Sequence, residues 1–201
     1  MELFKRIITT VLAALVLTSC SSMNSAITIG DKEFSTSDVQ KPVDEVLRDR
    51  KKVDTSQMQL PEADELLRNQ AQFYIVGILL DRIAADKKLS VTNADIAARR
   101  TEILSQVGGE AELPKALVGA SLAQSNLDAY LKILIISEKL SKDIILSGVS
   151  SEQAAEEVNK IVVALAKKLG VKVNPKYGKW NPDTASIESG DLTDGAVIPA
   201  P

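Results

Sequence analysis

Apolar residues recur at intervals of three and four along most of the chain, which is the spacing of one face of an α-helix. The spacing predicts helices that begin near residues 37, 62, 92, 110, 125 and 150. The helix from about residue 62 to 88 is apolar almost all round between residues 73 and 80, so we expect this stretch to be the most buried. The main apolar positions are Val39, Val43 and Val46; Leu66, Leu67, Phe73, Val76, Leu80 and Ile83; Ile96, Ile103 and Leu104; Leu127, Leu131, Leu134, Ile135 and Leu140; and Val158, Val162 and Leu165.

Polar residues with the spacing of helix caps precede three of these helices. The pairs are Thr92 with Asp95, Ser125 with Asp128, and Ser150 with Gln153. Pro42 is compatible only with the start of a helix or with a bend. We therefore expect the first helix to begin close to Ser37 or to bend at Pro42.

Two segments with alternating or β-branched apolar residues predict strands. Residues 26–34 read as a strand, a tight turn at Gly30-Asp31 and a second short extended piece, and residues 171–173 alternate in the same way. We expect 27–29 to pair with 171–173. The predicted fold is mainly α, with five to six helices in one domain over residues 26–180 and a small two-stranded β pair that joins the domain ends.

Residues 181–201 contain four acidic side chains, no basic ones and no hydrophobic period. Such a composition is typical of a segment that cannot bury enough apolar surface to offset the entropy of ordering. The sequence therefore predicts a disordered tail over 181–201.

The first twenty residues have the pattern of an export signal. Lys5 and Arg6 precede an apolar run from Ile7 to Leu17, which is shorter than the roughly 20 residues of a membrane span. The ending Leu17-Thr18-Ser19-Cys20 resembles the lipobox of bacterial lipoproteins. The resemblance implies a signal peptide over residues 1–19, a diacylglyceryl group on Cys20, a tether over 20–25 and an anchor on the extracytoplasmic face of a cell membrane. The alternative is a chance cysteine in an ordinary signal peptide.

Composition removes several classes of function. The chain has no histidine and a formal net charge of −3 without a basic block, and Cys20 is its single cysteine. Histidine-based catalysis, imidazole metal sites and nucleic-acid binding are therefore not expected. No Gly-rich phosphate loop is present, so we expect no cofactor and no metal.

Three stretches resemble the SurA/PrsA-type chaperone domain. They are the Gly-Asp turn region of residues 26–34 with the Ser-rich helix start that follows, the segment Leu89-Ser90-Val91-Thr92-Asn93-Ala94-Asp95-Ile96-Ala97, and the ending Val171-Lys172-Val173-Asn174-Pro175-Lys176-Tyr177-Gly178-Lys179-Trp180. The last is similar to the ending of short actinobacterial lipoproteins with a SurA-like N-terminal domain. Together the three stretches place the resemblance over about residues 26–180.

The resemblance implies a peptide-binding domain shaped like the chaperone part of trigger factor. The expected function is an ATP-independent chaperone that binds unfolded, exported proteins by shallow hydrophobic capture. The larger relatives carry parvulin isomerase domains with histidines in the site, whereas this chain has neither the histidines nor room for the domain, so we do not expect an enzyme. The alternative is an accessory envelope lipoprotein that binds one fixed protein partner.

Aromatic and large aliphatic residues are the candidates for contact with a client. They are Phe73, Tyr74, Ile78, Tyr130, Leu134, Tyr177 and Trp180. An alternative role in the core is open for all of them, since runs such as 73–80 and 133–136 are often simply core. For Tyr177 and Trp180 this alternative is a clamp that holds the chain end onto the helices.

Overall fold

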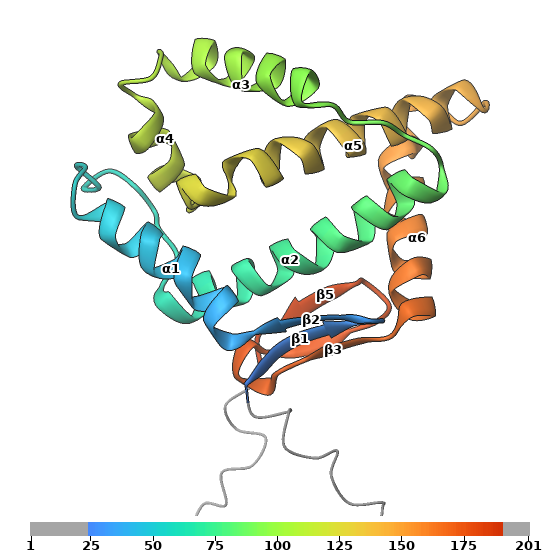
Figure 1. Cartoon of the computed structure of the whole chain (residues 1–201), viewed down its shortest axis with the longest axis horizontal. Helices are drawn as coiled ribbons and strands as arrows, with labels where there is room; N and C mark the ends of the chain where they lie inside the picture. Colours follow the sequence, from blue (N-terminus) through green and yellow to red (C-terminus); the bar gives the residue numbers. More distant parts are fainter. Residues whose placement is uncertain (1–23, 191–201) are drawn as a thin grey trace, which may run out of the picture.

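A computed structural model describes residues 24–190 and confirms a mainly α fold with small antiparallel strand pairs (Figure 1). The helices of the described residues are α1 (Thr36–Arg50), α2 (Ala63–Asp86), α3 (Asn93–Val107), α4 (Leu113–Gly119), α5 (Leu127–Leu146) and α6 (Ser151–Leu169). The predicted signal peptide, the lipidation residue Cys20 and residues 191–201 lie outside the described residues. In the described part, no helix is both long enough and apolar enough to cross a membrane.

The predicted pairing of the two domain ends is confirmed. β1 (Ser25–Ile29) pairs antiparallel with β3 (Val171–Val173), and Ile27 lies opposite Val173. β2 (Lys32–Ser35) pairs with the other edge of β1, so the sheet has three strands in the order β2-β1-β3. Ile27 and Ile29 are fully buried against the helices while Lys172 is exposed, as a strand with one face on the core requires.

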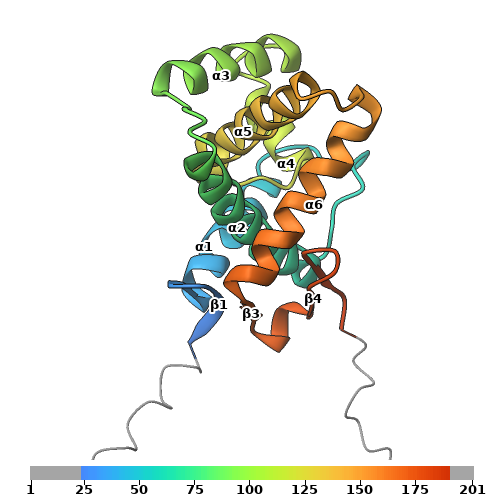
Figure 2. The ribbon, with the colours of Figure 1, turned by 90° about the vertical axis from the view of Figure 1, so that its right-hand side faces the viewer.

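Helix α2 is the centre of the fold. The sheet packs against its middle, α1 packs near its start, and α5 and α6 pack along it (Figures 1 and 2). Ile75 and Leu79 lie in the core beneath the sheet, and Leu80 joins a second core with Ile136 and Leu140 of α5. The prediction that residues 73–80 are the most buried stretch holds only for the face that carries Ile75, Leu79 and Leu80, because the other five residues are half-buried.

The helix caps follow the sequence in part. Thr92 and Asp95 form the predicted capping box of α3. The predicted box of Ser125 with Asp128 is wrong, because the backbone N–H and the hydroxyl of Ser125 both donate to the carboxylate of Glu45 on α1. The hydrogen bonds that Ser125 donates to this ionised carboxylate are stronger than the neutral hydrogen bond that a serine hydroxyl accepts from a backbone N–H at a helix cap.

The prediction of a disordered tail is wrong for residues 181–188. The short η2 turn (Pro175–Tyr177) leads into a hairpin of β4 (Lys179–Asn181) and β5 (Ser186–Glu188). Ala185 and Ile187 of this hairpin are buried. The side chain of Gln72 on α2 donates to the Ala185 carbonyl and accepts from the Ile187 N–H, each at 2.9 Å. The domain therefore continues through this hairpin.

Candidate functional site

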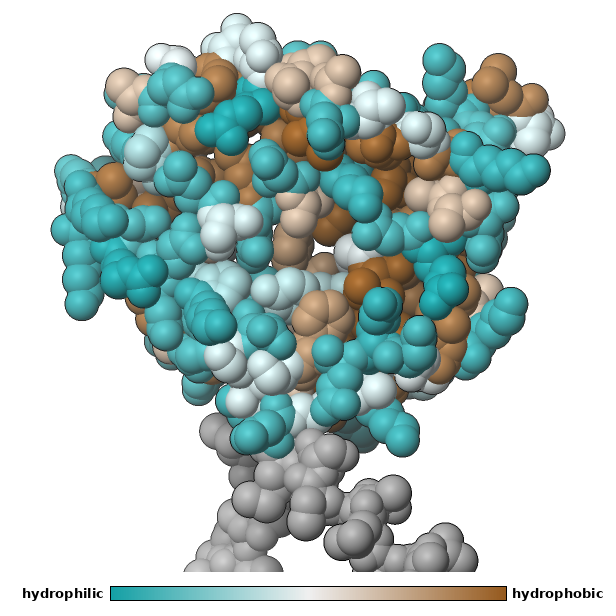
Figure 3. Space-filling view, in the orientation of Figure 1, coloured by the Kyte–Doolittle hydropathy of each residue, from teal (hydrophilic) through white to brown (hydrophobic). Residues whose placement is uncertain are grey.

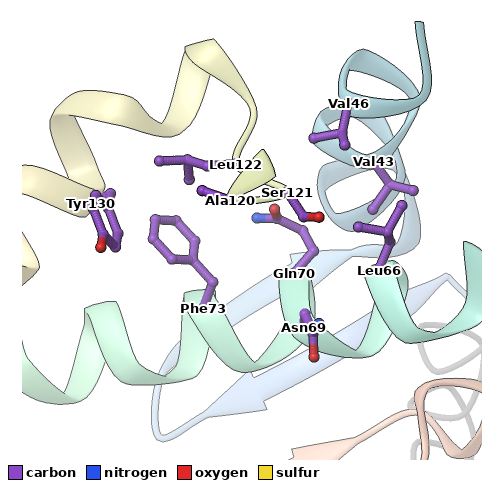
Figure 4. A pocket seen from close by; sticks show the side chains of 10 residues that line it. All are labelled: Val43, Val46, Leu66, Asn69, Gln70, Phe73, Ala120, Ser121, Leu122 and Tyr130. Atoms are coloured by element: carbon purple, nitrogen blue, oxygen red, sulfur yellow. The ribbon is translucent and has the colours of Figure 1, made fainter. Parts of the chain in front are cut away.

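A pocket of about 200 Å³ opens between α1, α2 and the chain that joins α4 to α5 (Figure 4). Its walls are lined by Val43, Val46, Leu66, Asn69, Gln70, Phe73, Ala120, Ser121, Leu122 and Tyr130. On the face shown in Figure 3, hydrophobic residues are visible in the hollow between the two halves of the molecule, and hydrophilic residues surround them. The lining contains no charged side chain, which suits the pocket to a neutral ligand.

Phe73 and Tyr130 stand at one end of this pocket. Both rings line the pocket, and Figure 4 shows them at the left of the view, one from α2 and one from α5. Phe73 is half-buried and Tyr130 is 37% exposed, so the aromatic end of the pocket is open to solvent. The helical spacing i, i+4, i+7 places Leu66, Gln70 and Phe73 on the same face of α2. The pocket floor is thus a direct consequence of the sequence of this helix.

Gln70 and Asn69 are the polar residues that α2 contributes to the pocket, and Gln70 lies on the same face as Leu66 and Phe73. In the Gln70 side chain, the two ends of the amide differ in their contacts. Its Oε1 accepts a hydrogen bond from Nδ2 of the buried Asn126 at 3.0 Å. Its Nε2 is buried and has no hydrogen-bond partner among residues 24–190. Figure 4 shows the amide pointing into the pocket. A buried donor without a partner costs free energy, and a ligand that offers an acceptor removes that cost.

The opposite wall of the pocket is fixed by Arg50 at the end of α1. Its guanidinium donates to the Pro61 carbonyl at 2.8 Å and to the Ser121 hydroxyl at 3.2 Å. Burial lowers the pKa of Arg50. Ser121 has a φ of 53°, a left-handed backbone that is strained for a residue other than glycine. These contacts hold the α4–α5 connection against α1 and keep the wall of the pocket in place.

Of the predicted contact residues, the structure places Phe73 and Tyr130 in the lining of the pocket and the others outside it. Tyr74 stacks on Phe34 with ring centroids 4.7 Å apart and donates from its hydroxyl to the Asp38 carbonyl. Burial, and then the nearby charge of Asp38, raise the pKa of Tyr74. Tyr74 therefore joins α2 to α1 and the sheet.

The other candidates do not line the pocket. Tyr177 is 1% exposed, so its assignment as a client contact is wrong and it is part of the core. Ile78 and Trp180 are partly buried against the same core, and Leu134 is half-buried on α5. The structure supports the alternative given for Tyr177 and Trp180, a clamp at the chain end.

Sequence reasoning identified only Phe73 and Tyr130 among the residues that line the pocket, and Gln70 and Leu122 are two of those it missed. Gln70 carried a usable signal, because it interrupts the apolar stripe between Leu66 and Phe73. Leu122 carried none, since its position depends on how the α4–α5 connection folds back. Among residues 24–190, no group of three or more acidic, cysteine or histidine side chains is placed to hold a metal ion.

Comparisons of the chain with protein-family models, with curated protein sequences and with solved structures found no match.

Proposed function

We propose that this protein is a lipid-anchored, extracytoplasmic chaperone that captures apolar segments of unfolded, exported proteins without ATP. The lipobox-like Leu17-Thr18-Ser19-Cys20 supports the anchor. The observation that carries the proposal is the neutral, apolar pocket with Phe73 and Tyr130 at its open end. The proposed function includes no enzymatic step.

The size of the pocket suits capture followed by release. Burial of one large apolar side chain contributes about 1.5–3 kcal/mol. Association costs about 4 kcal/mol or more in lost translational and rotational freedom, and a client that becomes ordered on binding loses side-chain entropy as well. One pocket of about 200 Å³ therefore holds a client only weakly. Weak binding allows a client to leave and fold without an energy source.

The position of the pocket is compatible with the proposed anchor. Both ends of the described chain lie at the sheet end of the molecule (Figures 1 and 2). Helix α2 lies between the strands of the sheet and the side chains that line the pocket (Figure 4). A tether that precedes β1 would thus hold the sheet end toward the membrane and leave the pocket open on the other side of α2.

A second candidate function is an accessory lipoprotein that binds one fixed partner. The observation that favours it is the small volume of the pocket together with the single buried donor of Gln70, since defined polar groups give a site specificity. Under this alternative the pocket would receive one side chain of one partner.

Light scattering separates the two functions. Residues 21–201, which include every described element, are added to several unrelated denatured proteins. A chaperone slows the aggregation of most of them, and Phe73→Ala weakens this effect. Ile145→Ala, at another exposed apolar residue of α5 outside the pocket, is the matched control. Protection of none of the clients contradicts the chaperone proposal and favours the fixed partner. A proline-limited refolding rate that the protein leaves unchanged is expected, because no isomerase domain is proposed.

A further inference from the structure

We propose that Gln70 recognises the backbone of the client: its Nε2 donates a hydrogen bond to a main-chain carbonyl, while the adjacent apolar side chain fills the space beside Phe73 and Tyr130. This inference rests on the proposed function and specifies the ligand as an extended peptide segment. It assigns to Gln70 a role that the apolar walls cannot perform.

The orientation of the Gln70 amide is set by the fold. Asn126 lies at the junction of the short η1 turn (Gln124–Asn126) and α5, is 8% exposed, and donates to Gln70 Oε1 at 3.0 Å. This contact occupies the acceptor end of the amide and leaves the donor end toward the pocket. The Nε2 group makes no hydrogen bond of good geometry in the described residues, although the Gln70 side chain is close enough to the Tyr74 hydroxyl, one turn later on α2, to offset in part the rise that burial causes in the pKa of Tyr74. Since nearly all buried polar groups in proteins are paired, an unpaired donor that faces a ligand-sized pocket is available to an acceptor on the ligand.

The chemistry of the lining selects a neutral acceptor. No charged side chain lines the pocket, and the guanidinium of Arg50 behind the wall is already hydrogen-bonded to the Pro61 carbonyl and the Ser121 hydroxyl, so a carboxylate or phosphate would meet no counter-charge at the pocket surface. A peptide carbonyl is neutral and is present at every residue of a client. In folded proteins more than about 90% of buried backbone carbonyls are already paired. A hydrogen-bond donor in the pocket that needs a free carbonyl therefore selects unfolded or extended segments over folded ones. This selection does not depend on the amino-acid sequence of the client.

The volume of the pocket sets the size of the side chain. An apolar cavity of about 150 Å³ accommodates benzene. The pocket here, at about 200 Å³, has room for one aromatic ring or one branched aliphatic side chain. The ligand is thus a short segment with one large apolar side chain next to a free carbonyl.

Two probes and matched variants test this inference on residues 21–201. The probes are a blocked peptide, acetyl-Ser-Phe-Ser-amide, and toluene, which has an aromatic ring and no carbonyl. Gln70→Glu keeps an oxygen acceptor for Asn126 and replaces the donor, whereas Gln70→Met removes both groups at similar volume. Gln106→Glu, at an exposed position of α3, is the control for added charge. Binding is measured from the NMR shifts of the Phe73 and Tyr130 rings.

We expect Gln70→Glu and Gln70→Met to weaken peptide binding about tenfold, the effect of one lost hydrogen bond, and to leave toluene binding unchanged. Unchanged peptide binding in both variants overturns the inference, as does an equal loss for both probes, which would make Gln70 a support of the pocket wall. If peptide binding weakens as the protein concentration is raised, a second copy of the protein occupies the pocket. That result would also overturn the inference. If the wild-type pocket binds neither probe, the proposed chaperone function itself fails. Failure of the inference about Gln70 alone looks different, because the wild-type protein then still binds the probes.

Discussion

The hydroxyl of Tyr74 on α2 donates a hydrogen bond to the backbone carbonyl of Asp38 on α1, at 3.1 Å. In a regular helix this carbonyl accepts the N–H of the residue four positions later. That residue is Pro42, which has no N–H. Tyr74 therefore supplies the partner that the helix cannot, and this explains how α1 contains a proline in its second turn.

Tyr74→Phe should lower the free energy of unfolding by about 1–2 kcal/mol, because it leaves the Asp38 carbonyl without a donor. The ring and its stacking on Phe34 remain. In a Pro42→Ala background, the restored N–H of residue 42 provides the helix bond, so the same change should cost less. Urea unfolding of the four proteins of this double-mutant cycle measures the difference. Equal costs in both backgrounds would show that the hydroxyl does not compensate for the proline.

The hairpin at the C-terminal end of the described chain should contribute to stability through Gln72. Gln72→Leu removes the hydrogen bonds to both Ala185 and Ile187 and should reduce the free energy of unfolding by about 1–3 kcal/mol. A chain that ends at Trp180 should lose at least as much, because Ile187 no longer covers the core. Thermal unfolding of these two proteins and of a chain that ends at Gly190 gives the comparison. A melting temperature that the Trp180 truncation leaves unchanged would restore the prediction of a dispensable tail.

The ion pair between Arg99 on α3 and Glu138 on α5 should make the stability of the protein depend on pH. Helix α3 has no buried residue, so ionic contacts help to hold it in place. The hydrogen bond from Arg99 lowers the pKa of Glu138 below the ordinary value of 4.5. A carboxylate with a lowered pKa stabilises the fold above its ordinary pKa, and this contribution is lost as the pH falls through the lower folded value.

Glu138→Gln should thus cost about 0.5 kcal/mol at neutral pH, a value that allows for the exposure of the pair to solvent. It should also flatten the loss of stability between about pH 5 and pH 3. Glu33→Gln, at an exposed position of β2, is the control. Urea unfolding across this pH range is the measurement. Parallel curves for the wild type and Glu138→Gln would rule out the proposed contribution.

The anchor predicts a clear result in cells. Cys20→Ser removes the thiol that would receive the lipid, so the protein should be released from membranes or left uncut. Cell fractionation and the mass of the mature protein report both outcomes. Processing and membrane association like those of the wild type would show that Leu17-Thr18-Ser19-Cys20 is not a lipobox.

Periodicity in the sequence was sufficient to predict the helices and the pairing of β1 with β3. Long apolar stripes such as that of α2 give a strong helical signal. In β1 and in β3, apolar residues alternate with a polar one, as in Ile27-Thr28-Ile29 and Val171-Lys172-Val173. The β4–β5 hairpin gave no such signal, because each of its strands has a single apolar residue, Trp180 or Ile187, and one apolar position shows no alternation. Its order depends on Gln72, which lies more than 100 residues earlier in the chain.

The candidate site was predictable where it depends on one helix. Phe73 was identified from the aromatic run of α2, and Tyr130 from α5. The assignment of Tyr177 failed because an aromatic residue near the chain end has the same sequence signal whether it is exposed or buried. The closing of the pocket by Leu122 and the unpaired amide of Gln70 depend on contacts between elements, which a single sequence does not contain.

Photo-crosslinking at position 130 tests the central claim most directly. p-Benzoylphenylalanine replaces Tyr130 at the open end of the pocket, and in a second protein it replaces Leu146, which is 77% exposed and lies outside the pocket. Each protein is irradiated with a client in its denatured and in its native form. The account predicts crosslinks from position 130 to the denatured client, few from position 146, and few to the native client from either. Absence of crosslinks from position 130, or equal crosslinking from position 146, would contradict the claim that this pocket captures unfolded proteins.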